Sequence, residues 1–186
     1  MERFKIIPTN IDGLMIMERL VIKDNRGSFT RLFDMSEFHK AGMMNPILQI
    51  NHACTKIKGT VKGLHFQNPP HSELKVVTCL RGEVFDVAVD LRRGSKTFLS
   101  WHGEYLSEFN NKTLVIPRGF AHGFQAMTND CELLYFHDAN YDPGSEGGFH
   151  VEDKRIGIKW PLPISVMSDR DMNLASIHPG FEGMEP

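Results

Sequence analysis

Short apolar runs separated by turn residues recur along the whole chain. Val, Ile, Leu and Phe are concentrated in these runs, and Gly, Pro, Asn or Asp lies between them. This spacing is typical of the strands of a β-sandwich or barrel. The predicted strands are residues 14–17, 20–22, 75–80, 83–91, 112–116, 125–127 and 133–136.

The stretch 84–91 has two different faces. Alternate residues from Phe85 to Leu91 are apolar and share one side, whereas Asp86 and Asp90 share the other. A strand with carboxylates on one face is expected to line a site.

Helical signals are few and short. The best one covers residues 35–42, where Asp34 or Ser36 is placed to cap the first turn. A second short turn is expected to begin at Ser168. The Gly-rich segment 142–148 predicts a loop.

A single all-β domain is expected over residues 1–186. This length suits one well-buried core, and no repeat or linker divides the chain. We assign the core to residues 11–171 and a C-terminal tail to residues 172–186, whose Pro and Gly residues indicate a loose end.

Composition and charge limit the partners. The 21 Lys and Arg residues and 23 Asp and Glu residues give a formal net charge of −2, so we expect no nucleic-acid or membrane partner. A local basic pocket for one small phosphate ligand is compatible with this balance. The three cysteines form no Cys-x-x-Cys pair, and no secretory signal or membrane-spanning run is evident. We therefore expect a cytoplasmic protein with reduced thiols.

The densest chemical signal is the segment 59–70, which reads Gly-Thr-Val-Lys-Gly-Leu-His-Phe-Gln-Asn-Pro-Pro and includes His65. A strand histidine is most often structural. Here it is followed by Lys75, by a second histidine in segment 116–124, and by a polar segment with two tyrosines. This combination favours a site over a structural role.

These segments resemble the cupin-fold nucleotide-sugar epimerases typified by dTDP-4-dehydrorhamnose 3,5-epimerase. The resemblance runs from Ile11 to Asp171. It is carried by Asp24-x-Arg-Gly-x-Phe29, Gln49-x-Asn51, Gly63-Leu-His-Phe-Gln67, Lys75, Asp86-Val-x-Val-Asp-Leu-Arg92, Pro117-x-Gly-Phe-Ala-His-Gly-Phe124 and the pair Tyr135 and Tyr141. It implies a cupin-type double-stranded β-helix, or jelly-roll barrel, with a few short helices.

The resemblance also implies a reaction. Such an isomerase inverts C3, C5 or both in a nucleotide-diphosphate-linked 4-keto-deoxyhexose, without a cofactor, in deoxysugar biosynthesis of the O-antigen type. Removing a proton next to a ketone needs a base, a donor for the enolate oxygen, and an acid on the opposite ring face. By resemblance, His65 is the base and Asp171 holds its tautomer. Lys75 stabilises the enolate, and Tyr135 returns the proton.

Substrate-binding roles follow from the same resemblance. The residues implied for the diphosphate are Lys62, His122 and Arg170, with Arg26 reaching from a partner subunit. Those implied for polar groups of the sugar or nucleotide are Gln49, Asn51 and Glu146. Tyr141 and Phe29 are implied to sandwich the base. Relatives that exchange an N-terminal strand are dimers, so we expect a homodimer.

Three positions depart from the family pattern. Lys62 and Arg170 stand where Arg and Lys are usual, so the charge is kept. Arg31 stands where a glutamate usually contacts the base. A guanidinium offers only donors, which favours a base rich in acceptors and predicts CDP first and GDP second as the carrier. In the alternative, Arg31 simply points to solvent.

Three rival functions remain open. They are a nucleotide-sugar 3,4-ketoisomerase, a non-catalytic sugar-binding cupin and a metal-dependent cupin dioxygenase. Lys75 and the Gly-Leu-His block favour epimerisation. Metal-binding cupins place two histidines one residue apart. Here His65 and His71 are six apart, and although His71, Glu73 and His122 could assist, we expect no metal.

Overall fold

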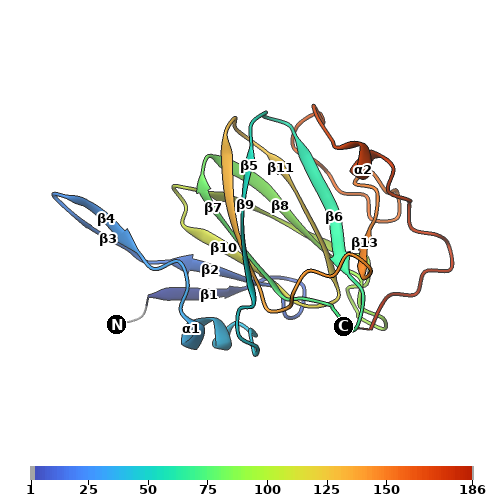
Figure 1. Ribbon diagram of the computed structural model, residues 1–186, viewed down its shortest axis with the longest axis horizontal. Coiled ribbons are helices and arrows are strands. Elements are labelled where there is room, and N and C mark those ends of the chain that lie inside the picture. The colour runs from blue at the N-terminus through green and yellow to red at the C-terminus, as the bar shows by residue number, and fades with distance from the viewer. Residues whose placement is uncertain (1–2, 186) are drawn as a thin grey trace.

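Two antiparallel β-sheets packed face to face form the body of the molecule in the computed structural model, which describes residues 3–185 (Figure 1). The six-stranded sheet has the order β1 (Phe4–Pro8), β2 (Met15–Arg19), β10 (Lys112–Ile116), β7 (Lys75–Arg81), β12 (Cys131–His137) and β5 (Gln49–Thr55). The five-stranded sheet has the order β13 (Glu146–Gly148), β6 (Val61–Gln67), β11 (Phe120–Ala126), β8 (Glu83–Asp90) and β9 (Trp101–Ser107). The chain crosses repeatedly between the sheets, which confirms the predicted all-β jelly-roll class.

The main core fills the space between the two sheets. Val77, Leu114 and Leu133 of the six-stranded sheet are buried in one cluster with Ala88 and Phe124 of the five-stranded sheet. Each side chain buried in this way stabilises the fold by roughly 1.5–3 kcal/mol relative to an exposed one. This core fixes the separation of the two inner faces.

The C-terminal segment covers the outer face of the five-stranded sheet. The apolar face of β8, with Phe85 and Val87, shares a second buried cluster with Ile156 and Ile177. The Met184 amide donates to the Leu91 carbonyl at 2.8 Å, so the chain end also pairs with the sheet. The expected loose tail over residues 172–186 is therefore wrong as far as residue 185, because the outer face of β8 is apolar and must be covered.

Two short helices begin where the sequence predicts them. Helix α1 (Met35–Lys40) is capped by Asp34, whose carboxylate accepts from the Ser36 amide, and it packs on the outer face of the six-stranded sheet. Helix α2 (Asp169–Met172) is capped by Ser168. Among residues 3–185, no helix has the length and apolar character that crossing a membrane requires.

The hairpin of β3 (Val21–Asp24) and β4 (Gly27–Thr30) projects away from the body (Figure 1). Ile22 and Phe29 on this hairpin are exposed. The segment 142–148 is only partly the expected loop, because its end forms β13 along the edge of β6.

We predict that Ile177→Ala lowers the free energy of unfolding by about 2–5 kcal/mol, because the side chain is only 5% exposed in the second core. The matched control is Ile57→Ala, at a position that is 52% exposed, which is expected to change it by about 0.5 kcal/mol or less. Denaturant titration measures both. Equal changes in the free energy of unfolding of the two variants would mean that the C-terminal segment does not form part of a core.

Candidate active site

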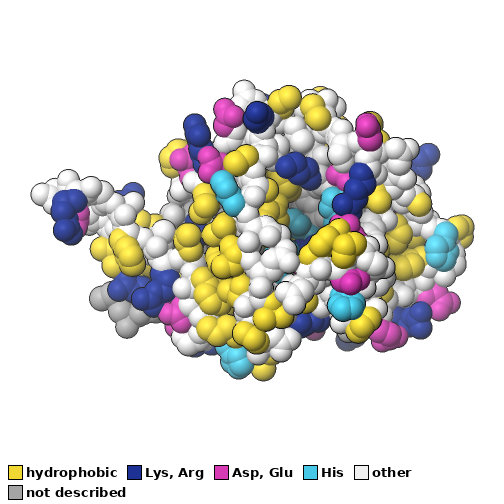
Figure 2. Space-filling view, viewed as in Figure 1, with side chains coloured by type: hydrophobic (Ala, Val, Ile, Leu, Met, Phe, Trp, Pro, Cys, Tyr) yellow, Lys and Arg dark blue, Asp and Glu magenta, His cyan; other side chains and the backbone are white. Residues whose placement is uncertain are grey.

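A cavity of about 310 Å³ opens between the two sheets. Figure 2 shows a hollow on this face, with Lys or Arg and His side chains around it and inside it. The residues that line it from the six-stranded sheet and the turn before β7 are Gln49, Asn51, Glu73, Lys75, Tyr135 and His137. Those that line it from the five-stranded sheet are Lys62, His65, His122, Phe124 and Glu146.

Strand register explains the polar wall on the six-stranded sheet. Tyr135 lies directly opposite Asn51, and His137 lies opposite both Gln49 and Lys75. Because directly paired residues of antiparallel strands point to the same face, all five side chains share the inner face. The same alternation carries Leu133, one step earlier on β12, into the core.

His65 is held by a buried carboxylate. Its Nε2 lies 2.8 Å from Asp171 Oδ1, and the other oxygen of Asp171 accepts from the Gly63 amide at 3.1 Å. Burial acts to raise the pKa of Asp171, but the hydrogen bonds from His65 and Gly63 outweigh it, so this pKa is lowered. An ionised Asp171 selects the tautomer of His65 that carries its proton on Nε2, which leaves Nδ1 as a free base.

Tyr135 faces His65 from the opposite sheet. Burial, followed by the negative charge of Asp86, raises the pKa of the Tyr135 phenol well above its ordinary value. The phenol therefore keeps its proton across the physiological range and is suited to donate it. Lys75 lies on the same wall and forms an ion pair with Glu73 at 3.0 Å.

A polar rim surrounds the mouth of the cavity. The Tyr141 hydroxyl donates to Glu146 at 2.8 Å, and Arg170 forms an ion pair with Glu146 at 2.6 Å. Deeper in the cavity, His122 Nε2 lies 2.9 Å from Asp86 Oδ1. Of the two carboxylates predicted on one face of residues 84–91, Asp86 holds this histidine, whereas Asp90 accepts from Arg92, Ser95 and Thr97, and neither carboxylate lines the cavity itself.

Four predicted substrate-binding residues do not line the cavity of their own chain. Arg170 meets it through Glu146 at the rim, and the other three lie on or next to the hairpin of β3 and β4. Arg26 forms an ion pair with Asp24 at 2.7 Å on the projecting hairpin, and Phe29 is 60% exposed there. Arg31 is exposed and forms a surface ion pair with Asp34 at 2.6 Å, which agrees with the alternative in which it faces solvent. The expected roles of these three residues require another chain.

The sequence reasoning gave no active-site role to two ionisable residues of the wall. Glu73 lies two residues before Lys75, and His137 lies two residues after Tyr135. The two-residue period of a strand, extended from Tyr135, would have found His137. Glu73 lies in the turn before β7, where no strand period applies, so its place in the wall follows only from the fold.

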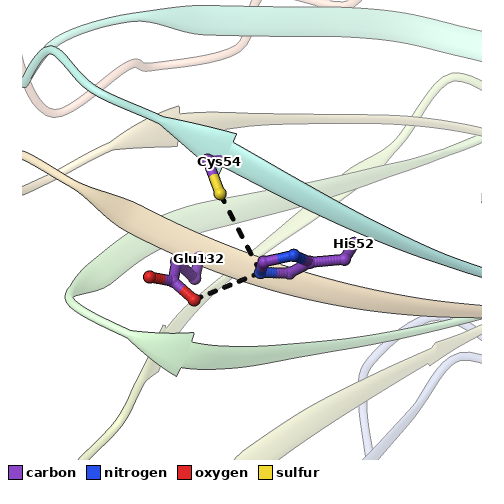
Figure 3. Close-up of side chains that lie close together, drawn as sticks. All are labelled: His52, Cys54 and Glu132. Carbon is purple, nitrogen blue, oxygen red and sulfur yellow. Dashed lines mark hydrogen bonds and ion pairs between the residues drawn. The ribbon is translucent and has the colours of Figure 1, made fainter.

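Metal-type donors gather elsewhere. Among residues 3–185, the group of three such side chains within reach of one ion is His52, Cys54 and Glu132 (Figure 3). His52 and Cys54 alternate with Asn51 and Ala53 along β5, so the group lies on the face of the sheet that points away from the cavity. The histidines considered for a cupin metal site are not part of it.

Known proteins with similar sequences and structures agree with this geometry. Residues 8–178 match the dTDP-4-dehydrorhamnose 3,5-epimerase family. The chain is 41% identical over 169 residues to the dTDP-4-dehydrorhamnose 3,5-epimerase of Shigella flexneri, covering 90% of this chain and 93% of the relative. It is 39% identical over 176 residues to that of Methanothermobacter thermautotrophicus, covering 93% and 94%.

A solved structure extends the likeness to three dimensions. The dTDP-6-deoxy-D-glucose-3,5-epimerase of Legionella pneumophila, crystallised with dTDP-4-keto-L-rhamnose, superposes with a TM-score of 0.89 at 38% identity and covers 93% of this chain and 92% of its own. Its fold is the predicted cupin fold. On the sequence and the structure together, the chain belongs to the dTDP-4-dehydrorhamnose 3,5-epimerase family.

Proposed function

We propose that the protein inverts the carbon atoms next to the ketone, C3, C5 or both, of a nucleotide-diphosphate-linked 4-keto-6-deoxyhexose. The observation that carries the proposal is the placement of a base and an acid on facing sheets: His65 on β6 and Tyr135 on β12. A flat enolate held between them can lose a proton to one wall and gain one from the other. Inversion follows from this geometry.

The first step removes a proton from carbon. Nδ1 of His65 takes the proton, and the electron pair of the C–H bond moves into the ring to form the enolate. Asp171 stabilises the imidazolium that results, since its ionised carboxylate is 2.8 Å from Nε2. The Lys75 ammonium lies on the cavity wall and stabilises the negative charge that develops on the ketone oxygen.

The second step returns a proton to the opposite face. The electron pair of the enolate takes the phenolic proton of Tyr135 at the same carbon, and the ketone re-forms. The raised pKa of Tyr135 supports this role, because a phenol that stays protonated is available as an acid. Between turnovers, solvent takes the proton from His65 and returns one to Tyr135.

The basic residues around the mouth support binding of a diphosphate. Lys62 and His122 line the cavity, and Arg170 lies at its rim against Glu146. We assign the diphosphate to these three residues and polar groups of the sugar or nucleotide to Gln49, Asn51 and Glu146. Tyr141 is exposed beside Glu146 and is placed to stack on the base.

The carrier nucleotide is the least constrained part of the proposal. The relatives named for dTDP-linked sugars support dTDP. Arg31, the basis for CDP or GDP, already donates to Asp34 within its own chain, which leaves fewer of its donors free for a base. We propose dTDP as the carrier to test first, and the CDP and GDP predictions are decided by the same assay.

We propose further that the active unit is a homodimer. The projecting hairpin exposes Ile22 and Phe29, and apolar side chains of this kind are normally covered by a partner. A hairpin that reaches a second chain would bring Arg26 and Phe29 to that chain's cavity, where Phe29 would complete the sandwich with Tyr141. The free thiols Cys54, Cys79 and Cys131 support a cytoplasmic place of action, with a product destined for deoxysugar-containing polysaccharide.

We predict that the purified protein exchanges substrate protons with deuterated water. Incubation with dTDP-, CDP- and GDP-linked 4-keto-6-deoxyglucose, followed by NMR, locates deuterium at C3 and C5. His65→Ala should lower the exchange rate by at least about 100-fold, because no other base adjoins Asp171. The absence of exchange with all three substrates would contradict the epimerase proposal, and near-normal exchange in His65→Ala would reassign the base.

We predict that an altered hairpin and an altered cavity complement each other. Arg26→Ala and His65→Ala are each expected to be impaired alone. When the two variants are coexpressed, they should form mixed dimers. In each mixed dimer, one of the two cavities has an intact His65 and receives a hairpin with an intact Arg26. Random pairing restores roughly a quarter of the cavities.

The matched control combines His65→Ala with Asp171→Asn, two changes in the same cavity wall. That mixture should restore nothing, because every cavity keeps one defect. If the Arg26→Ala mixture is also no more active than its components, the hairpin does not serve a partner's cavity.

A further inference from the structure

Three ionisable side chains meet in the wall of the cavity. One carboxylate oxygen of Glu73 lies 3.0 Å from the Lys75 ammonium, and the other lies 2.8 Å from Nδ1 of His137. These three residues come from two adjacent strands and the turn before one of them. Because His137 pairs directly with Lys75, the register places these two side chains on the same face, and Glu73 contacts both of them from the turn before β7.

The cluster is buried from bulk solvent and faces the cavity. The side chains of Glu73 and His137 are each 9% exposed, and that of Lys75 is 11% exposed. Burial of Glu73 acts to raise its pKa, but the hydrogen bond from His137 and the charge of Lys75 outweigh this effect and lower the pKa. Glu73 is therefore ionised near neutral pH and accepts hydrogen bonds from both neighbours.

Burial of three ionisable side chains in a cavity wall has an unfavourable free energy of desolvation. Desolvation of buried charged groups often cancels their attraction, and apolar residues of similar volume would stabilise the fold as well or better. The neighbouring inner-face positions of the same strands, Val77 and Leu133, are indeed apolar. The charges begin where the inner face stops being core and becomes cavity.

The orientation of His137 follows from its partner. An ionised Glu73 accepts from Nδ1, so a neutral His137 ring carries its proton there and presents Nε2 as an acceptor. This Nε2 lies 3.4 Å from the Asn51 amide nitrogen, which is long for a hydrogen bond. The position suits a hydroxyl donor on a sugar held between His137 and Asn51.

We propose that Glu73 is a positioning residue that directs the Lys75 ammonium toward the ketone oxygen and fixes His137 as the acceptor for a ring hydroxyl of the sugar. The proposal rests on the proposed function, since it assigns these groups to the same 4-keto sugar. Glu73 itself does not touch the reacting atoms. It acts because one ionised carboxylate orients two donors at once.

We predict that Glu73→Gln lowers kcat for deuterium exchange by about 10-fold or more while KM changes by less than about threefold. An amide has one acceptor oxygen, so it cannot accept from Lys75 and His137 together without turning a donor toward one of them. The loss falls on kcat because the Lys75 charge is needed as the enolate forms. Steady-state kinetics of the exchange assay measures both constants.

The matched control is Glu132→Gln on the outer face of the same sheet. Glu132 also accepts from a histidine, His52 Nε2 at 3.1 Å (Figure 3). Because His52 alternates with the cavity residue Asn51 along β5, this pair faces away from the cavity. Its kcat should stay at the wild-type value. Thermal unfolding of both variants shows whether each is folded at the assay temperature. If Glu73→Gln is not folded, Glu73→Asp replaces it, and its kcat is expected to fall in the same way because a carboxylate one methylene shorter cannot reach Lys75 and His137 together.

The outcomes separate this inference from the proposed function. If wild-type protein gives no exchange, the proposed function fails. If wild-type protein is active and a folded Glu73 variant has the same kcat as Glu132→Gln, only the positioning role is overturned. A fall in both variants would also overturn it, because the outer pair does not meet the substrate.

We predict, as a test of His137, that wild-type protein prefers the natural sugar over an analogue lacking the C2 or the C3 hydroxyl by about 10-fold or more in kcat/KM. Loss of a hydroxyl leaves the buried acceptor without a partner. In His137→Phe this preference should disappear for one of the two analogues. An unchanged preference for both hydroxyls would show that His137 binds neither.

Discussion

Side chains alternate between the two faces of every strand, and this alternation limits the fold of the molecule most strongly. The inner face of each sheet must form core at one end and cavity wall at the other. On β12 the same face carries Leu133 into the core and then Tyr135 and His137 into the cavity. The core keeps the sheets at a fixed separation. His65 on one sheet and Tyr135 on the other, the proposed base and acid, therefore face each other across a fixed gap.

The polar wall depends on this rigid frame for its electrostatics. Buried carboxylates stay ionised only where donors surround them, as Asp171 is surrounded by His65 and Gly63, and Glu73 by Lys75 and His137. Each carboxylate in turn fixes the proton of one histidine. The site is thus prepared before substrate arrives, and this preparation is the source of most electrostatic stabilisation of a transition state.

The spacing of apolar runs predicted the all-β class, and the family resemblance implied nine of the cavity residues, because the motifs that carry it keep their order along the chain. The sequence pattern missed β5 and β9, whose mixed residues such as Gln49 to Thr55 give no apolar pattern. It also misjudged the C-terminal segment. The apolar face of residues 84–91 is visible in the sequence, but that the segment with Ile177 covers this face becomes evident only in three dimensions. His137 and Glu73 were overlooked as partners since their pairing joins positions 64 residues apart.

The central claim is that proton removal and proton return occur from opposite walls, and the Tyr135→Phe variant tests it most directly. Deuterium exchange at the carbon next to the ketone reports removal by His65, whereas the ratio of epimers reports return by Tyr135. The account predicts exchange within a few-fold of wild type and net inversion slower by about 100-fold or more. Equal loss of exchange and inversion would contradict the arrangement of base and acid on opposite sides of the sugar.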